Sequence, residues 1–401
     1  MKFLHTGDLH LGKTFHERSL IQDQQHMLNQ LIQELVSCSQ SSAGQDLFMQ
    51  PYQALVIAGD VYDRAAPSTE AVALFDEFLT TLKQKLPELH IIIIPGNHDS
   101  QRRLSFAASM LKFQKIHIAS TMQDALTPVI IDSVAFYPLP FMNPNFLEDG
   151  QTSQQGMIQT AVQGIRNYHQ EHHPELAKVL VAHLFTLGGT TSDSERVFIG
   201  TAELVDGNLF QDFDYVALGH LHRCQNPGGG NIWYSGSPLA YSFSEAGNKN
   251  CFLRVELHPE KNATVENPAL EVSPIPVEPL HKVCRLEGAF EEFYQDTEGK
   301  YQEYKDSYLE ISSTDLAPKE NPIALLQARY PYLLSYRQDL ATANTSSVTM
   351  EQRRQLIQQA GEDSSPTPDI FTAFMQDIYQ QLPENFDQEL ELFKNILEEM
   401  K

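Results

Sequence analysis

The sequence predicts an α/β protein, and three observations carry that prediction. Buried apolar runs alternate with amphipathic segments through the first third of the chain, a rhythm typical of a mainly parallel sheet. Four consecutive isoleucines at 91–94 indicate a strand covered on both faces. Polar residues follow directly after several such runs. Because open α/β sheets bind their ligands at the carboxyl ends of the strands, these polar residues are candidates for a functional site.

The expected elements alternate along the first 260 residues. Helices with one apolar face are expected over residues 19–38, 68–85 and 155–170. Strands are expected at 3–6, 54–58, 90–94, within 116–141 (including 134–137), and at 178–182, 215–218, 232–235 and 251–256. Together these elements predict a four-layer α/β/β/α core over residues 1–272.

The composition changes after this core. The proline-rich run 273–279 predicts a stiff linker. Residues 280–340 predict a small α+β domain with the order strand, helix, strand, helix. Residues 341–368 are polar and predict a second linker. Residues 369–401 predict a helical tail, in which two amphipathic helices are separated at Pro383.

Length, charge and cysteine content narrow the class of protein. A chain of 401 residues suggests two or three domains. A formal net charge of −24 excludes a general basic surface that would coat nucleic acid, so positive charge for a phosphodiester must come from metal ions, a local patch or a partner. The four cysteines form no CxxC pair, which favours reduced thiols and a cytoplasmic location. No apolar run predicts a signal peptide or a membrane span.

Five predicted strands end in residues that commonly bind metal ions. The seven donors are Asp8, His10, Asp60, Asn97, His183, His220 and His222. Burying so many polar groups is costly unless they are paired or bind metal. The set contains no thiolate, which favours Mn²⁺, Fe or Mg²⁺ over structural zinc. Seven donors suit two ions about 3.5–4 Å apart that share one carboxylate, and they leave His98 as a proton donor to the leaving oxygen.

Several of these residues also have a purely structural interpretation. Asn97 and Asp99 could cap a helix after a turn. A single histidine such as His183 after a strand is more often a satisfied buried side chain. Asp63 and Asp99 could either hold ligand histidines or serve as turn residues.

Two groups of basic residues are given surface roles. His169, His172 and His173 lie in a polar stretch and are expected to be exposed to solvent. Arg102 and Arg103 are expected to form surface salt bridges, or alternatively to touch DNA phosphates.

The order of the motifs resembles the calcineurin-like metallophosphoesterases. The matching runs are Asp8-Leu9-His10, Gly59 to Arg64, Gly96-Asn97-His98-Asp99, Ala182-His183 and Gly219-His220-Leu221-His222. Two further runs, 192–196 and 236–245, are similar to the SbcCD-type DNA nuclease subunits within that family. The sequence departs from their pattern at Cys224, where proline is expected, and at Gln101-Arg102. Neither departure touches a proposed ligand.

The resemblance implies an activity, cofactors and partners. It implies hydrolysis of DNA phosphodiester bonds, as a double-strand exonuclease and a single-strand or hairpin endonuclease in repair, replication and recombination. Two Mn²⁺ ions are implied, with Mg²⁺ or Fe as alternatives. The implied partners are DNA, an SbcC-type coiled-coil ATPase and a second copy of the chain, forming a homodimer within a heterotetramer. No membrane is involved.

The resemblance also implies a role for each donor. One ion would be held by Asp8, His10, Asp60 and His222, and the other by Asp60, Asn97, His183 and His220. Asp60 would bridge the ions, and His98 would orient the scissile phosphate or protonate the leaving group. The small domain would cap the site. The helical tail would dock on the ATPase, unless it folds back on the core.

Two other functions fit the same residues. A small-molecule phosphodiesterase or phosphatase could use the same metal core, although the small domain and the tail argue against it. A scaffold without activity would be expected to lose ligands, and here every ligand position is filled.

Overall fold

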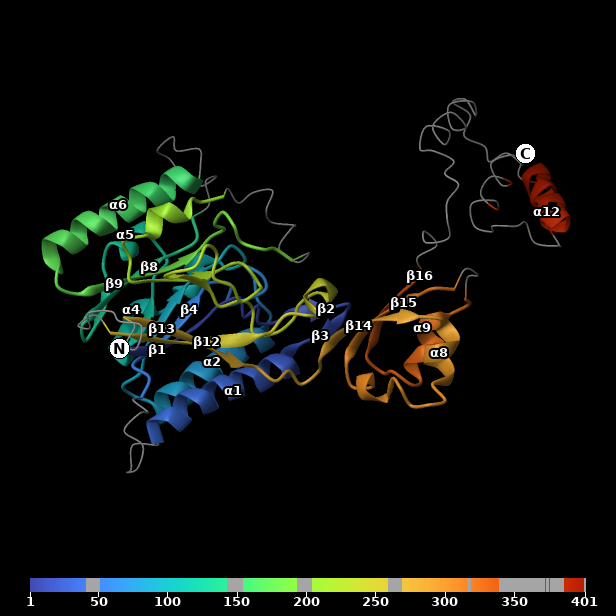
Figure 1. The fold of residues 1–401 in the computed structure, drawn as a ribbon, viewed down its shortest axis with the longest axis horizontal. Coiled ribbons are helices and arrows are strands. Elements are labelled where there is room, and N and C mark those ends of the chain that lie inside the picture. Colours follow the sequence, from blue (N-terminus) through green and yellow to red (C-terminus); the bar gives the residue numbers. More distant parts are fainter. Residues whose placement is uncertain are drawn as a thin grey trace. The chain divides into compact units, whose positions relative to one another are not determined.

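A computed structural model of the chain describes residues 1–40, 51–142, 154–192, 204–258, 269–315, 319–338, 372, 375 and 386–399. The chain divides into two compact units, Met1–Val283 and Cys284–Lys401. The first unit contains a six-stranded and a five-stranded sheet, and the second contains a three-stranded sheet (Figure 1). The predicted mixed α/β class is therefore confirmed.

The six-stranded sheet carries three of the loops that hold the predicted donors. Its strands, in spatial order, are β13 (Leu270–Pro276), β12 (Cys251–Leu257), β1 (Lys2–Thr6), β4 (Ala54–Ala58), β5 (His90–Ile94) and β6 (Ile116–Ile118). The four strands from β1 to β6 are parallel, and β12 and β13 are antiparallel additions beside β1. Every residue of β1 and β4 is buried, as strands covered on both faces require.

The five-stranded sheet carries the remaining donors. Its order is β11 (Ile232–Tyr234), β10 (Tyr215–Gly219), β9 (Ala177–His183), β8 (Val134–Leu139) and β7 (Val129–Ile131). All neighbouring pairs are parallel except the β7–β8 hairpin. One face packs against the six-stranded sheet, where Phe3 of β1 contacts Phe136 and Tyr215 edge-on. Because the two sheets share this apolar core, the ends of their strands are held close together.

Helices cover the outer faces of the two sheets. α6 (Gln154–His172) and α5 (Met122–Ala125) pack on the five-stranded sheet. α1 (Ile21–Gln40) and α2 (Thr69–Lys85) lie together on the far side of the six-stranded sheet (Figure 1). Ser68 begins α2 by accepting a hydrogen bond from the Ala71 amide at 3.2 Å.

Short elements complete the first unit. They are β2 (Thr14–Phe15), β3 (Arg18–Ser19), α3 (Gln101–Leu104), α4 (Ala108–Leu111), η1 (Lys112–Gln114), η3 (Gly207–Phe210) and η4 (Phe243–Glu245). None of the described helices is long and apolar enough to cross a membrane.

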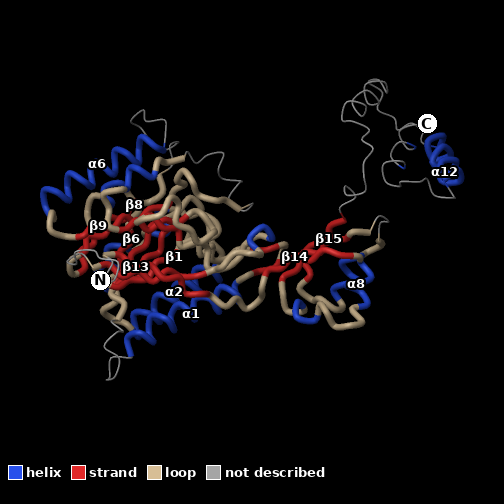
Figure 2. Tube along the Cα trace, viewed as in Figure 1, coloured by secondary structure: helices blue, strands red, loops and turns tan. Residues whose placement is uncertain are grey.

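The second unit has its own small core. Its sheet has the order β14 (Val283–Gly288), β15 (Tyr308–Ser313) and β16 (Leu333–Gln338). Along the chain, α8 (Phe290–Gln295) and η5 (Gln302–Tyr304) follow β14, and α9 (Pro322–Gln327) follows β15. Figure 2 shows β14 and β15 in red and α8 in blue. Phe293, Leu309, Leu326 and Tyr330 form the centre of this core. A further helix, α12 (Phe386–Glu399), corresponds to the second of the two amphipathic helices predicted in the tail, the one after Pro383.

Two expectations about backbone structure were wrong. Most of the run 273–279 is not a linker, because β13 extends to Pro276 and pairs with β12. Pro274 and Pro276 are tolerated there because β13 is an edge strand, where a missing amide need not break a ladder. The predicted order of the small domain also omitted β16, whose residues are mostly only half-buried.

His169 is also not the exposed residue that was expected. It is only 6% exposed, and its Nδ1 atom lies 3.0 Å from the Tyr137 hydroxyl. Four residues after the buried Ile165, it falls on the face of α6 that packs on the sheet. His172 is exposed as expected, and His173 is half-buried. Arg103 binds the carbonyl oxygen of Ala65 at 2.9 Å instead of a carboxylate.

Some predictions fall outside the described residues. These are the polar linker 341–368, the run 193–196, and all of 369–385 except residues 372 and 375.

Candidate metal centre

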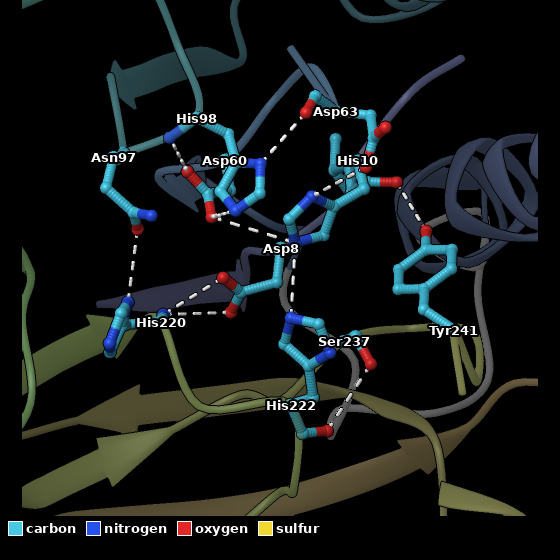
Figure 3. Close-up of polar contacts among 12 residues, drawn as sticks. Asp8, His10, Asp60, Asp63, Asn97, His98, His220, His222, Ser237 and Tyr241 are labelled. Carbon is cyan, nitrogen blue, oxygen red and sulfur yellow. Dashed lines mark hydrogen bonds and ion pairs between the residues drawn. The ribbon is translucent and has the colours of Figure 1, made fainter. Parts of the chain in front are cut away.

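The predicted donors meet at the carboxyl ends of five parallel strands. Asp8 and His10 follow β1, Asp60 follows β4, Asn97 follows β5, His183 ends β9, and His220 and His222 follow β10. Figure 3 shows the donors of both sheets facing one another across the site. Six of the seven are buried and Asn97 is half-buried. The structure thus brings together every donor that the sequence pattern suggested.

Glycines make room for this convergence. A Cβ atom on Gly96 would overlap the carboxylate of Asp60, and one on Gly59 would overlap the ring of His183. A side chain at either position would therefore push a donor out of place. These two glycines are needed for close approach, and Gly59 also has a positive φ of 90°.

Four donors have a left-handed backbone, which is unfavourable for residues other than glycine. The φ angles are 52° for Asp8, 44° for His10, 48° for Asp60 and 103° for His220. Each such residue costs about 1–3 kcal/mol and persists only where its surroundings hold it. Here the Asp8 amide donates to Gly59 O at 3.0 Å and the His10 amide donates to Asp60 O at 2.9 Å. Strain concentrated at these positions is typical of functional sites.

The first group of donors gathers around His10. Its Nε2 atom lies 3.1 Å from Nε2 of His222 and 3.6 Å from Oδ2 of Asp60. The Asp8 carboxylate completes a cluster in which donor atoms of Asp8, His10 and His222 lie within 4.8 Å of one another. The His220 amide donates to both oxygens of Asp8, at 2.9 and 3.1 Å, and so fixes that carboxylate.

The second group gathers around Asn97. Its Oδ1 atom lies 2.9 Å from Nε2 of His183 and 3.1 Å from Nδ1 of His220. His183 Nε2 is also 3.5 Å from Oδ2 of Asp60. The same oxygen of Asp60 therefore approaches a histidine of each group, as a bridging carboxylate would.

The hydrogen bonding of His183 indicates that this group suits a cation. Its Nδ1 atom donates to the carbonyl oxygen of Ala58 at 2.9 Å, because a carbonyl can only accept. In the neutral imidazole, Nε2 is then an acceptor that faces a second acceptor, Asn97 Oδ1, at 2.9 Å. In this orientation of the Asn97 amide, a proton or a cation between the two atoms would bind both of them. Two neighbouring ligand atoms that each bind the same cation at about 2.1 Å lie about 3 Å apart, which is the separation of these two acceptors.

Burial and charge shift the proton affinities of the donors. Burial raises the pKa of Asp8 to about 7 and lowers that of His220 to about 3. Burial also opposes charge on His183, but Asp60 and Asp8 outweigh it and raise its pKa to about 9. The protein without metal therefore holds protons that a bound cation would displace.

His98 lies beside the donors with one ring nitrogen already engaged. Nδ1 donates to the carbonyl oxygen of Asp63 at 2.8 Å, and Nε2 lies 4.0 Å from Oδ2 of Asp60. Its amide donates to the other Asp60 oxygen at 2.9 Å. Its side chain is 15% exposed, whereas His183 is fully enclosed. His98 can therefore meet a substrate that enters from solvent.

The two alternatives for Asp63 and Asp99 separate clearly. Asp99 accepts hydrogen bonds from the amides of Val61, Tyr62 and Gly96 at 2.9–3.0 Å, so it shapes the turns. Asp63 instead lies 3.6 Å from Nδ1 of His10 and pairs with Lys13 at 2.8 Å. Of the two, Asp63 is thus the carboxylate that faces the Nδ1 atom of a donor histidine, His10.

The sequence reasoning missed the roles of two residues within the run 236–245. Tyr241 donates from its hydroxyl to the carbonyl oxygen of Leu9, between Asp8 and His10 (Figure 3). Glu245 is fully buried and lies 3.1 Å from Nδ1 of His222. The resemblance pointed to this run, but no spacing in the sequence predicted which donors it would contact.

A comparison with families of known proteins identifies a match over the first half of the chain. The model of the calcineurin-like phosphoesterases matches residues 1–224. The matched range contains all seven donors and His98, and it ends before Tyr241, Glu245, β12 and β13.

Proposed function

The chain belongs to the calcineurin-like phosphoesterase family, whose members hydrolyse phosphoester bonds, and on that premise we propose that it is a metal-dependent DNA nuclease. We further propose that it is the nuclease subunit of an SbcCD-type complex. The observation that carries the hydrolytic part is the pair of donor groups that share Asp60, with His98 beside them.

The donor set fits two divalent cations. Asp8, His10, Asp60 and His222 would hold one ion, and Asp60, Asn97, His183 and His220 the other. We propose Mn²⁺, with Mg²⁺ or Fe as alternatives, because the donors mix carboxylate, amide and imidazole without thiolate. When bound, two such ions would lower the pKa of water and stabilise the attacking and leaving oxygens at phosphorus.

His98 supplies the proton in this proposal. Because Asp63 O fixes the Nδ1 proton, the atom that gains or loses a proton is Nε2, which lies on the Asp60 side. In the imidazolium form Nε2 can donate to the leaving oxygen of the substrate. The rigid turn built by Asp99 keeps this ring in place.

Local positive charge supports a DNA substrate despite the net charge of −24. Four exposed arginines lie in the loops that carry donors or in the helix α3 that follows one of them, namely Arg64, Arg223, Arg102 and Arg103. Exposed guanidinium groups are suited to the phosphates that flank a scissile bond. The resemblance of the runs 192–196 and 236–245 to SbcCD-type nucleases favours DNA over a small phosphoester.

The partners are also proposals. We propose that residues 369–401, including α12, dock on an SbcC-type coiled-coil ATPase, and that the unit after Val283 caps the site. We propose a homodimer formed through the segment from α3 to η1, where Phe106, Met110 and Phe113 are 82%, 72% and 88% exposed. Such a cluster of exposed apolar side chains is typical of an interaction surface.

The substrate proposal is tested by an Mn²⁺-dependent assay on linear duplex and hairpin DNA, with and without the ATPase subunit. Cleavage of both DNAs is expected. Turnover of bis-p-nitrophenyl phosphate without cleavage of either DNA would instead indicate a small-molecule phosphodiesterase. A protein that binds metal but cleaves neither substrate would be a scaffold.

The partner proposal needs a separate test. A chain that ends at residue 365 should cleave the activated ester at the normal rate but no longer co-purify with the ATPase. Co-purification of the shortened chain would exclude docking through the tail.

A further inference from the structure

We propose that Glu245 is a positioning residue of the metal centre, which holds the His222 imidazole with its Nε2 atom toward the ions. The inference rests on the proposed function, because it gives His222 the role of a ligand. It adds to the centre a residue that lies outside the matched range 1–224.

The contact between the two side chains fixes the proton of His222. Oε1 of Glu245 lies 3.1 Å from Nδ1 of His222, and both side chains are buried. A carboxylate can only accept, so Nδ1 carries the proton. Nε2 of His222 is then left as a lone-pair donor, and it lies 3.1 Å from Nε2 of His10. This is the ring orientation that a ligand of the first ion needs.

Hydrogen bonds from an amide and two hydroxyl groups help to hold Glu245 in place. Oε2 accepts from the Tyr241 amide at 2.9 Å, and Oε1 accepts from the hydroxyls of Ser242 and Ser192, each at 3.0 Å. The carboxylate is therefore oriented by the protein before any metal binds. A carboxylate behind a ligand histidine raises the basicity of that ligand and fixes its tautomer.

The loop that carries Glu245 is also tied to the donor loops. The Ser237 amide donates to the carbonyl oxygen of His222 at 3.0 Å, and Asn250 donates to Ser237 O at 2.9 Å. Tyr241 reaches the loop after β1 through Leu9 O. The run 236–245 thus holds the backbone of His222 as well as its ring.

The contrast with His183 makes the inference specific to one ion. The Nδ1 proton of His183 is held by the neutral carbonyl of Ala58, whereas that of His222 is held by a buried carboxylate. Loss of the charge on Glu245 should therefore weaken the ion bound by His222 and leave the other ion unaffected.

The test is a calorimetric Mn²⁺ titration of the full-length, metal-free protein without DNA, with Glu245→Gln compared with the wild type. Glu245→Gln should bind one of two ions about 10–100-fold more weakly, the range for loss of a partner behind a metal ligand. Glu34→Gln is the matched control. Glu34 lies on α1, and it also accepts hydrogen bonds from side chains, those of Tyr52 and Arg254. This control should bind both ions normally.

Unchanged affinity for both ions in a folded Glu245→Gln protein would overturn the inference, as would equal weakening of both. If the variant does not fold, ¹⁵N NMR of the wild-type protein loaded with diamagnetic Mg²⁺ decides. His222 should show a protonated Nδ1 and a metal-bound Nε2. The opposite tautomer would overturn the inference.

These outcomes are separable from failure of the proposed function. A wild-type protein that binds two ions but leaves DNA intact would refute the nuclease and leave the role of Glu245 standing. A wild-type protein that binds no ions would refute the metal centre itself.

Discussion

The buried carboxylates of the two units are neutralised in different ways. Glu310 of β15 lies between two arginines of its own sheet, 2.8 Å from Arg285 on β14 and 2.9 Å from Arg337 on β16. Asp60 of the first unit pairs with histidines at 3.5–4.0 Å, and these are themselves candidate metal ligands. In the small unit the chain supplies the cations, whereas in the first unit the partners of the carboxylate belong to clusters that could hold a metal ion.

The largest expected effect concerns Asp60, the buried carboxylate of the first unit. Asp60→Asn removes the carboxylate whose Oδ2 atom approaches a histidine of each donor group, so it should release both ions and lower DNA cleavage by about 10⁴-fold or more. The metal content of the purified variant and its turnover measure this. Two tightly bound ions together with normal cleavage would remove Asp60 from the bridging position.

His98→Ala should have a smaller effect and leave the ions in place. General acids contribute about 10²–10⁴-fold, so DNA cleavage should fall within that range while two Mn²⁺ ions remain bound. The loss should shrink on a p-nitrophenyl ester, whose leaving group needs little protonation. Loss of an ion would exclude the proton-donor role, and equal loss on both substrates would indicate that His98 orients the phosphate.

Metal removal should destabilise the protein more as the pH rises. Without metal, the pKa of Asp8 is raised from 3.8 to about 7, so its proton stabilises the fold at low pH and that stability is lost between about pH 4 and 7. The pKa of His183 is raised from 6.5 to about 9, so its contribution is lost between about pH 6.5 and 9. Bound cations replace both protons.

Thermal unfolding with Mn²⁺ and with EDTA, from pH 5 to 9, measures this effect. The difference in Tm should widen with pH, by about 2–4 °C for each kcal/mol. Asp60→Asn serves as the control and should show little difference at any pH. A difference that stays constant would show that these protons do not compete with the metal.

The smallest expected effect concerns Glu310, the buried carboxylate of the second unit. Glu310→Gln leaves two arginines without their partner, and because both are partly exposed the cost should be about 1–3 kcal/mol. Urea unfolding measures it, and Mn²⁺ affinity should not change. Glu291→Gln is a matched control, because Glu291 pairs with Lys319 at 3.5 Å on the surface and should cost under about 0.5 kcal/mol.

The elements and donors that the sequence predicted share a local cause. Apolar runs such as 91–94 determine parallel strands, and parallel strands bring the residues after them to one edge. That logic was enough to place Asp8, Asp60 and Asn97 together at one edge of the six-stranded sheet. It needs only the period of the apolar residues and the direction of the strands.

The features that were missed depend on contacts between distant segments. Glu245 ends the short 3-10 helix η4 and contacts His222 from there, and an element of three residues has no period to detect. The prolines of β13 are typical of a linker until the strand beside them is known. Likewise, the left-handed backbone of Asp8 and Asp60 follows from the close packing of two loops, not from the residues themselves.

The position of β1 between β4 and β12 has a consequence for synthesis of the chain. β4 emerges from the ribosome soon after β1, but β12 begins only at Cys251. At about 5–20 residues per second, one edge of β1 stays unpaired for roughly 12–50 s. An unpaired apolar strand edge can pair with another chain, so a nascent chain in this interval is a natural substrate for chaperones. The helix η4, which ends at Glu245, emerges just before β12, so the candidate metal centre is among the last parts of the first unit to be completed.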